Sequence, residues 1–438
     1  MPGQVRFDSL GGWLDWQLAL HPQPIELGLD RMERVARRTD WSPPRCPVIT
    51  VGGTNGKGSC VALADSILRA GGYRTATFTS PHLIDYAERI RLQGQPASPA
   101  SLVAAFERIA DALGSDTLTF FEFNTLAALL IFETAAPDAL ILEVGMGGRL
   151  DAVNIVDADV AVVVSLGIDH AEWLGADLDS IAHEKAGIFR AGRPAIYGGE
   201  DPAPRALVEA ARAQGAMLRL RGRDFRETAR ADGRWDLTVT KEGADLRLAA
   251  LPPSALMGSA QLGNAATTIA ALMALASRLP LAREAIARGL EQVRLPGRFH
   301  RIADGDVEWV LDVAHNPAAA RVLAASLRAT QTDRRTIAVC GMLADKDVPA
   351  VLVELRGCVD MWIAATTEGS RGLADAELAR RAGEAGIVMQ HGGGISESMS
   401  LARSCAHAGD RILVFGSFHT AGPALALLTA RGLTAPDA

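Results

Sequence analysis

The stretch VITVGGTNGKGSC, residues 48–60, decides the fold of this chain. A β-branched run at 48–51 enters a turn that contains three glycines, and Lys57 then opens a helix-like stretch. A strand, a glycine turn and a helix N-terminus in this order direct several backbone N–H groups, and the positive end of the helix dipole, to one point. Lys57 adds a cation that can reach the β- and γ-phosphates of a nucleotide. The stretch therefore predicts a phosphate-binding loop in an α/β fold.

This loop departs from the common phosphate-binding pattern G-x-x-x-x-G-K-[ST] in two places. Val51 stands where the first glycine would fall, and Gly58 separates Lys57 from Ser59. Glycine-rich turns also join strands to helices in proteins that bind no phosphate. On this pattern alone, a phosphate site and a plain tight turn both remain open.

The rest of the chain alternates short β-branched runs with helical patterns, which is typical of α/β proteins with mainly parallel sheets. Strands are expected at 48–51, 73–79, 139–144 and 159–165 and, after a Pro-Gly turn near 295, at 308–313, 335–340, 359–366 and 411–415, each of these last four followed by a helix. Other expected elements are a helix from Pro99 after Ser98, a hairpin at 235–248, and helices at 262–278 and 281–291. We expect an N-terminal P-loop ATPase-like domain with a mainly parallel sheet, residues 1–294, and a smaller C-terminal Rossmann-like α/β domain, residues 295–438.

Composition excludes several classes of protein. The net charge of -7 argues against a general nucleic-acid binder, which would carry a basic face. No apolar run approaches the ~18 residues of a membrane span, and the first residues lack the pattern of an export signal. The five cysteines never form C-x-x-C and read as free thiols of a reducing compartment. We expect a cytoplasmic monomer that binds neither nucleic acid nor membrane.

Further motifs in the chain point to a family. With GTNGKGS at 53–59, they resemble the signatures of the Mur ligase superfamily, and specifically of dihydrofolate synthases and folylpolyglutamate synthases. They are TSPHL (79–83), YAERIRLQG (86–94), FFEFNTLAAL (120–129), LEVGMGGRLDAVNIV (142–156), GIDHAEWLG (167–175), IAHEKAGIFR (181–190), LPGRFH (295–300), DVAHNP (312–317), GMLADKD (341–347) and FGSFHT (415–420). Their order is that of the family, and the bifunctional bacterial enzymes are the nearest resemblance.

The resemblance implies a ligase that uses ATP and Mg²⁺. It would activate a carboxylate as an acyl phosphate, which the amine of L-glutamate then attacks. Dihydropteroate and tetrahydrofolate are the implied acceptors. A monofunctional folylpolyglutamate synthase is the alternative, and motif reading does not separate the two.

The resemblance also assigns the metal and catalytic residues, with two magnesium sites. The metal positions are Ser59, Ser80, Glu143, His170 and Lys185. A carboxylate and hydroxyls suit Mg²⁺, whereas His170 rests on the resemblance alone. Lys185 is expected to be carbamylated, which turns a cation into an anionic oxygen donor. The implied catalytic residues are Lys57, His170, Lys185 and His315.

The remaining motifs divide between nucleotide and acid substrate. The implied nucleotide-binding residues are Gly53, Thr54, Asn55, Gly56, Lys57, Gly58, Ser59, Asn264, Arg298 and Asp312. The implied substrate-binding residues are Gly28, Leu29, Asp30, Phe121, Glu122, Leu150, Asp151, Ala152 and Ser417. Phe121 could stack on a pterin ring and Asp151 could accept from an N–H. Without the resemblance, Phe121 reads as core and Asp151 as a helix cap.

Two other classes fit the sequence less well. A cell-wall Mur ligase carries a domain of about a hundred residues before the phosphate loop, for which Lys57 leaves no room. A switch GTPase should show a base-reading N-K-x-D motif, and none is evident.

Overall fold

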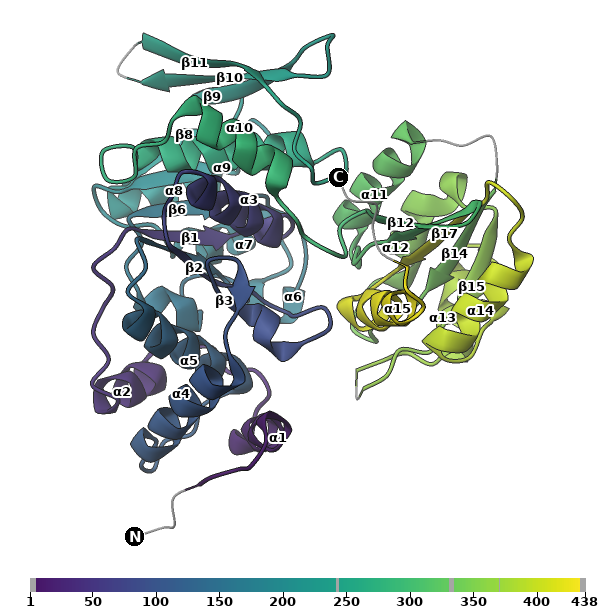
Figure 1. Cartoon of the computed structure of the whole chain (residues 1–438), viewed down its shortest axis with the longest axis horizontal. Helices are drawn as coiled ribbons and strands as arrows, with labels where there is room; N and C mark the ends of the chain where they lie inside the picture. The colour runs from purple at the N-terminus through teal and green to yellow at the C-terminus, as the bar shows by residue number, and fades with distance from the viewer. Residues whose placement is uncertain (1–4, 242–243, 331–334, 370, 434–438) are drawn as a thin grey trace. The chain divides into compact units, whose positions relative to one another are not determined.

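The computed structural model describes residues 5–241, 244–330, 335–369 and 371–433. By its contacts the chain forms two compact units. The first comprises residues 1–81, 87–254 and 262–293, and the second comprises 82–86, 255–261 and 294–438. Each unit is built around its own large sheet with helices packed on it, as Figure 1 shows. The expected α/β fold class is confirmed.

The large sheet of the first unit has eight strands in the order β4-β3-β2-β5-β1-β6-β7-β8. Their bounds are β1 Val48–Gly52, β2 Thr75–Phe78, β3 Ile90–Leu92, β4 Gln95–Pro96, β5 Ala139–Glu143, β6 Val160–Val163, β7 Pro194–Tyr197 and β8 Met217–Leu220. Strands β2, β5, β1, β6, β7 and β8 pair in parallel, while β3 and β4 form an antiparallel edge. Every residue of β1 is buried, because helices cover both faces of a parallel sheet.

Ten α-helices pack around this sheet within the described residues. They are α1 Leu10–Leu20, α2 Asp30–Arg38, α3 Lys57–Ala70, α4 Pro99–Ala112, α5 Phe120–Ala135, α6 Ala171–Leu174, α7 Leu178–Ala186, α8 Arg205–Gln214, α9 Gln261–Ala274 and α10 Arg283–Gln292, with 3₁₀ turns η1 Tyr86–Arg89 and η2 Ala152–Ile155. Helix α4 begins as expected, since the Ser98 hydroxyl accepts the Ser101 N–H at 3.1 Å. Helices α3 and α10 pack closely because Gly289 has no side chain: a Cβ there would lie 2.4 Å from the Ile67 Cα.

A separate three-stranded antiparallel sheet contains the expected hairpin. Its strands are β9 Phe225–Ala229, β10 Trp235–Lys241 and β11 Ala244–Leu251. The expected turn residues 242–243 lie outside the described residues. Trp235 anchors the sheet: its side chain is buried and its indole N–H donates to the Pro252 carbonyl at 2.7 Å.

The second unit holds a six-stranded sheet in the order β12-β13-β17-β14-β15-β16. The strands are β12 His300–Asp304, β13 Val307–Leu311, β14 Thr336–Cys340, β15 Met361–Ala364, β16 Gln390–His391 and β17 Arg411–Phe415. The helices are α11 Pro317–Ala329, α12 Val348–Leu355, α13 Asp375–Glu384, α14 Ile395–Cys405 and α15 Phe418–Ala430, with the 3₁₀ turn η3 Arg356–Cys358. Only β12 is antiparallel to its neighbour. Alternate residues of β17 enter two separate cores, Leu413 on one face and Ile412 on the other. This double coverage is the expected Rossmann-like arrangement.

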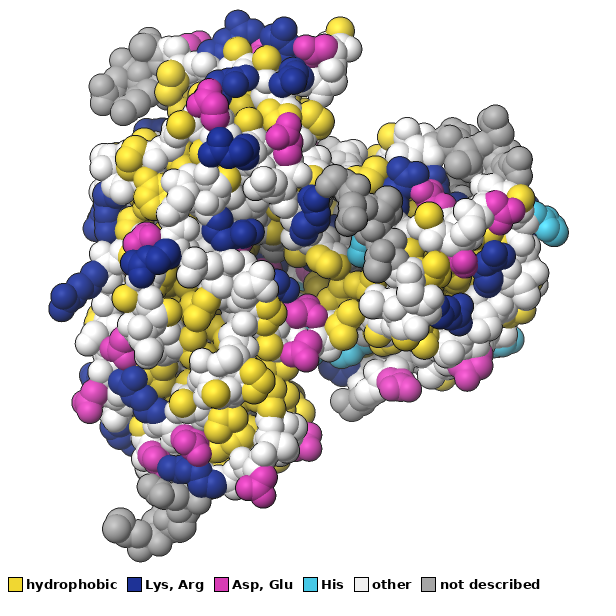
Figure 2. All heavy atoms as spheres, viewed as in Figure 1, with side chains coloured by type: hydrophobic (Ala, Val, Ile, Leu, Met, Phe, Trp, Pro, Cys, Tyr) yellow, Lys and Arg dark blue, Asp and Glu magenta, His cyan; other side chains and the backbone are white. Residues whose placement is uncertain are grey.

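On the face shown in Figure 2, Lys and Arg side chains are interspersed with Asp and Glu. Among the described residues, no helix combines the length and the apolar character needed to cross a membrane.

Candidate active site

The predicted phosphate loop lies between β1 and α3, at the carboxyl end of the central strand of the first unit. This is the edge of a parallel sheet where α/β proteins bind ligands. Gly53, with φ 139°, lies against the backbone that follows β6, since a Cβ there would be 3.1 Å from the Val164 and Ser165 nitrogens. The Thr54 N–H donates to the Ser165 carbonyl at 2.9 Å, and the Asn55 N–H donates to the Ser165 hydroxyl at 3.0 Å. The neighbouring segment therefore holds the loop in one conformation.

Two of the expected nucleotide-binding residues meet at the start of α3. Gly56 is the N-cap of this helix with φ 85°, a left-handed conformation that favours glycine. A Cβ at Gly56 would lie 2.9 Å from the Asn264 Oδ1, so Asn264 of α9 borders the loop. The first turn of α3 continues with Lys57, Gly58 and the buried Ser59.

Two lysines converge on one carbonyl oxygen of this loop. The Lys57 Nζ donates to the Gly53 carbonyl at 3.1 Å and to the Thr54 carbonyl at 3.2 Å. The Lys185 Nζ, from α7, donates to the same Gly53 carbonyl at 3.1 Å. Lys185 is only 4% exposed. Among the described residues, neither ammonium group forms an ion pair with a carboxylate.

This convergence changes the protonation of Lys185. Burial, and then the charge of Lys57, lower the pKa of Lys185 to about 7. The charges of Asp169 and Asp151 oppose the shift but do not cancel it. A lysine with this pKa is substantially neutral near pH 7, which makes its amine a nucleophile.

Glu143, an expected metal ligand, ends β5 beside the phosphate loop. Its side chain is buried, and its Oε2 accepts the Ser80 N–H at 3.2 Å. The same oxygen lies 3.8 Å from where a Gly58 Cβ would be, so Glu143, Ser80 and the first turn of α3 are together. A carboxylate with neighbouring serine hydroxyls is a donor set that suits Mg²⁺.

His170 is placed differently from the other expected metal ligands. It is exposed, adopts a left-handed conformation with φ 53° and forms the N-cap of α6. Its N–H donates to the carboxylate of the preceding Asp169 at 3.0 Å. Across the described residues, no group of three or more His, Cys, Asp or Glu side chains is arranged to hold a metal ion.

The three segments expected to bind the acid substrate are brought together. The Gly28 N–H donates to the Leu150 carbonyl at 3.2 Å, which joins residues 28–30 to residues 150–152. The ring of Phe121, at the start of α5, lies over Gly145, where an added Cβ would be 2.5 Å from the ring. Phe121 also packs against the core ring of Phe78, with centroids 5.8 Å apart. A Cβ at Gly28 meets no heavy atom within 4 Å, so this position borders open space.

Asp151 braces the turn in which it lies. It caps η2: one carboxylate oxygen accepts the Val153 N–H at 3.0 Å, and the other accepts the Met146 N–H at 2.9 Å. Burial raises the pKa of Asp151 to about 7, although these backbone N–H groups oppose the shift. Its neighbour Ala152 is buried as well. The helix-cap interpretation, which the residue pattern favoured without the resemblance, therefore describes the geometry of Asp151.

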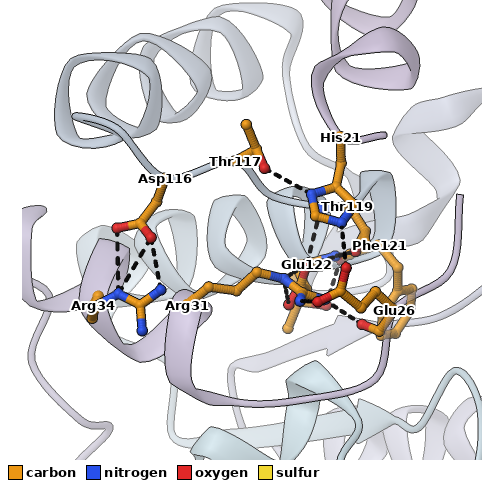
Figure 3. Close-up of polar contacts among 10 residues, drawn as sticks. His21, Glu26, Arg31, Arg34, Asp116, Thr117, Thr119, Phe121 and Glu122 are labelled. Carbon is orange, nitrogen blue, oxygen red and sulfur yellow. Dashed lines mark hydrogen bonds and ion pairs between the residues drawn. The ribbon is translucent and has the colours of Figure 1, made fainter. Parts of the chain in front are cut away.

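Glu122 also has a structural task that its motif did not reveal. Thr119 and Glu122 form a capping box at the start of α5, in which the Glu122 carboxylate accepts the Thr119 N–H at 2.8 Å. The same carboxylate pairs with Arg31, as Figure 3 shows. Sequence reasoning missed Arg31 and its partner Glu26. The T-x-x-E spacing of Thr119 and Glu122 was the available signal for the cap, but nothing local links it to Arg31.

The second unit gathers the remaining expected residues on neighbouring loops. The buried Asp312 carboxylate accepts the N–H groups of Phe299 and Ala314, each at 2.8 Å, and burial raises its pKa against the opposing charge of Arg298. The Arg298 guanidinium lies 5.1 Å from the centroid of the Phe418 ring. A ring nitrogen of His315 lies 2.8 Å from the Val313 carbonyl. The Ser417 hydroxyl lies 2.8 Å from that of Thr420 at the start of α15.

The fold and this site define the class of protein: an α/β phosphate-loop protein in which Lys57 and, from α7, Lys185 both donate to one carbonyl of the loop. The family pattern described as the Mur ligase middle domain matches residues 51–272, and that of the Mur ligase glutamate ligase domain matches residues 297–418. The chain belongs to the Mur ligase superfamily and, within it, to the dihydrofolate synthase/folylpolyglutamate synthase family.

Individual relatives match over nearly the whole chain. The chain is 41% identical over 425 residues to the dihydrofolate synthase/folylpolyglutamate synthase of Escherichia coli (strain K12), covering 96% of each. Its structure resembles that of E. coli FolC in complex with DHPP and ADP, with a TM-score of 0.90, 40% identity and coverage of 99% of this chain and 100% of that one. It also resembles a bifunctional folylpolyglutamate synthase/dihydrofolate synthase with Mn, AMPPNP and L-glutamate bound, with a TM-score of 0.88, 40% identity and coverage of 96% and 98%.

Proposed function

We propose that this chain is an ATP-dependent ligase that joins L-glutamate to dihydropteroate, giving dihydrofolate, and to tetrahydrofolate and its glutamylated forms. The observation that carries the proposal is the pair of lysines on the Gly53 carbonyl, in a chain that matches bifunctional relatives from end to end. Amide formation from a carboxylate is uphill in water, so the acid is first phosphorylated by ATP. The acyl phosphate then loses phosphate to the attacking amine.

The chain's own residues supply positioning and charge for this reaction. The N-terminus of α3 and the loop before it, residues 53–59, would border the nucleotide phosphates, while the Thr54 and Asn55 N–H groups hold the loop on Ser165. Asn264, Arg298 and Asp312 are the further nucleotide contacts. Lys57 stabilises the negative charge that develops as the terminal phosphoryl group moves. Ser59, Ser80, Glu143, His170 and Lys185 would hold two magnesium ions, which neutralise phosphate charge. Because Lys57 donates to backbone carbonyls and to no carboxylate among the described residues, its ammonium group can turn toward an arriving anion.

Carbamylation of Lys185 is part of the proposal. The neutral amine attacks carbon dioxide and loses one proton, which leaves an anionic carbamate on Nζ. The pKa of about 7 supports this step, since it provides neutral amine near pH 7. A carbamate would also replace the repulsion between two ammonium groups by an attraction to Lys57. ¹³C NMR of the protein in ¹³C-bicarbonate should give one carbamate signal that Lys185→Met removes.

For the acid substrate, we propose a site bordered by Gly28, Leu29 and Asp30, Phe121 and Glu122, and Leu150, Asp151 and Ala152. Phe121 would offer the edge or face of its ring to the pterin, and Ser417 and His315 would act near the glutamate or the phosphates. We also propose that residues 1–294 and 295–438 form the two domains, and that the protein is a monomer located in the cytoplasm.

A product assay tests the function. Purified protein, ATP, Mg²⁺ and L-glutamate are incubated with dihydropteroate or with tetrahydrofolate, and products are separated by mass. Glutamylated product from both acceptors supports the bifunctional ligase. Product from tetrahydrofolate alone leaves only the monofunctional synthase, and ADP release without any glutamylated product overturns the proposal.

A further inference from the structure

Residues 26–31 comprise the end of the α1–α2 loop and the first two residues of α2, and the side chain of Arg31 closes this segment. We call it the Arg31 loop. The Arg31 guanidinium turns back and donates to both the carboxylate and the backbone carbonyl of Glu26. Residues 27–30 between them include the Gly28 and Leu29 positions that border the proposed acid site. A single arginine therefore fixes both ends of this segment.

The third donor of the same guanidinium ties the Arg31 loop to α5. The Arg31 Nε lies 2.9 Å from the Glu122 carboxylate, and Figure 3 shows Arg31 between Glu26 and Glu122. The pair is well buried, with 12% and 4% of the two side chains exposed. Glu122 is itself fixed by the capping box with Thr119. The Arg31–Glu122 pair thus fixes the Arg31 loop to the start of α5, the helix that carries Phe121.

His21 supports the loop from the other side. One ring nitrogen lies 2.9 Å from the Glu26 carboxylate, and the other lies 2.7 Å from the Thr117 hydroxyl. His21 and then Arg31 hold the pKa of Glu26 below its usual range, so this carboxylate is ionised over the range of an ordinary assay. The end of α1, the loop, the start of α2 and the segment before α5 are joined in one polar network.

The next turn of α2 offers a matched comparison. Arg34 pairs with Asp116 at 2.7 Å, but half of its side chain is exposed and it touches neither Glu26 nor Glu122 by any described contact. Like Arg31, Arg34 is an arginine of α2 that pairs with a carboxylate, and Figure 3 shows both pairs. Ion pairs this exposed contribute little to stability.

We infer that Arg31 and Glu122 are positioning residues that hold the Arg31 loop where the folate-type acid binds. The inference rests on the proposed function, because that function supplies the acid. Arg31 acts through the backbone of residues 27–30, whose two ends it fastens and whose Gly28 N–H donates to the Leu150 carbonyl. We call the contacts of Arg31 with Glu26 and Glu122 the Arg31 clamp. Without this clamp, the Arg31 loop no longer presents a fixed backbone to the acid, whereas the phosphate loop between β1 and α3 is unchanged.

Steady-state kinetics of four full-length variants test the inference. Arg31→Met removes the clamp, and Arg31→Lys keeps the charge but lacks the fork needed to reach both partners. Glu122→Gln keeps a capping-box side chain while losing the charge that pairs with Arg31. Arg34→Met is the control. We expect the first three to raise KM for dihydropteroate and tetrahydrofolate tenfold or more, with KM for ATP within twofold of wild type, and Arg34→Met to change neither.

Binding of dihydropteroate in the absence of ATP, followed by protein fluorescence, separates this inference from the ligase proposal. If wild type binds dihydropteroate but forms no product, the function fails while the clamp is still tested by the binding constants. Unchanged acid binding in folded Arg31→Met overturns the inference, as does a parallel rise in KM for acid and ATP. If Arg31→Met does not fold, Arg31→Lys decides by the same criteria, because Arg31 is not among the residues placed at the acid site.

Discussion

The phosphate loop and the Arg31 loop lie in the same unit and use cations in opposite ways. Lys57 and Lys185 contact only backbone carbonyls among the described residues. Arg31 is neutralised by two carboxylates, Glu26 and Glu122. A lysine that a fold keeps free of carboxylates is available for chemistry, Lys57 to an anionic ligand and the neutral amine of Lys185 to carbon dioxide, whereas an arginine paired with carboxylates holds the scaffold. The partner set, more than the residue type, therefore separates a binding residue from a positioning residue.

The largest effect is expected from Lys57→Met. Loss of one cation aimed at the transferring phosphoryl group should lower kcat by roughly 10²–10³-fold, in line with the loss of a preorganised donor. In buffer free of carbon dioxide, where Lys185 carries no carbamate, the melting temperature should stay equal or rise, because the repulsion between Lys57 and the ammonium form of Lys185 disappears. ADP release and thermal melting measure the two quantities. Near-normal ADP release by the folded variant would refute the assignment of the phosphate loop.

Lys185→Met should change how stability depends on pH. The pKa of Lys185 is about 7 in the folded protein and near 10.5 when unfolded, so between these values the unfolded chain binds more protons. The free energy of unfolding of the wild type should therefore rise from pH 7 to 9.5 relative to the variant, by at most about 3 kcal/mol. Urea melts in buffer free of carbon dioxide and metal test this. Parallel pH curves for the two proteins would contradict it.

Asp151→Ala should distinguish the two acid acceptors. Dihydropteroate has fewer other anchors than tetrahydrofolate, so we expect kcat/KM to fall about tenfold further for dihydropteroate, which is about 1.4 kcal/mol. Since Asp151 also braces the turn from Met146 to Val153, both reactions should slow to some degree. Equal losses for both acceptors would show that its role is confined to that brace.

The smallest expected effect is that of salt. Lys57 is half-buried and unpaired, so its attraction to ATP is partly screened, and KM for ATP should rise about two- to threefold between 0.05 and 0.5 M KCl. The Arg31 loop is held by a buried ion pair, which salt screens less. KM for dihydropteroate should therefore change less than KM for ATP. A larger effect of salt on KM for dihydropteroate than on KM for ATP would contradict the contrast between Lys57 and the Arg31 loop.

Local features of the fold could be predicted from the sequence. Sequence reasoning found the phosphate loop, the Ser98 cap with Pro99 and the strands β1, β2, β5, β6, β13, β14, β15 and β17, each within a few residues, because these features depend on short stretches. Strand β2 is shorter than expected, since it spans 75–78, and helix α9 ends at Ala274. Sequence reasoning missed the short strands β3, β4, β7, β8, β9, β12 and β16. They have two to five residues each, which carry too little alternation of polar and apolar residues to mark a strand.

The site was predictable only where one motif carries it. The convergence of Lys57 and Lys185 on Gly53 depends on the order of strands in the sheet, and Arg31 meets Glu122 across 91 residues. No local pattern reports such a pair. The resemblance named Glu122 and Asp151 as substrate residues, whereas local sequence carries the signals for the caps that they form, the T-x-x-E spacing for Glu122 and the helix-cap pattern for Asp151. The bond from Asp151 to the Met146 N–H is not part of that local pattern.

The closed form of the Arg31 loop also affects how tightly a ligand can bind there. Ordering a free backbone costs about 1–2 kcal/mol per residue in conformational entropy. Residues 27–30 lose that freedom when the protein folds, because Arg31 fastens the ends of the segment. A ligand that contacts Gly28 then meets a preorganised surface and does not have to order it. An inhibitor built to reach this backbone should gain affinity mainly through slower dissociation, and a chain without the Arg31 clamp should lose that gain.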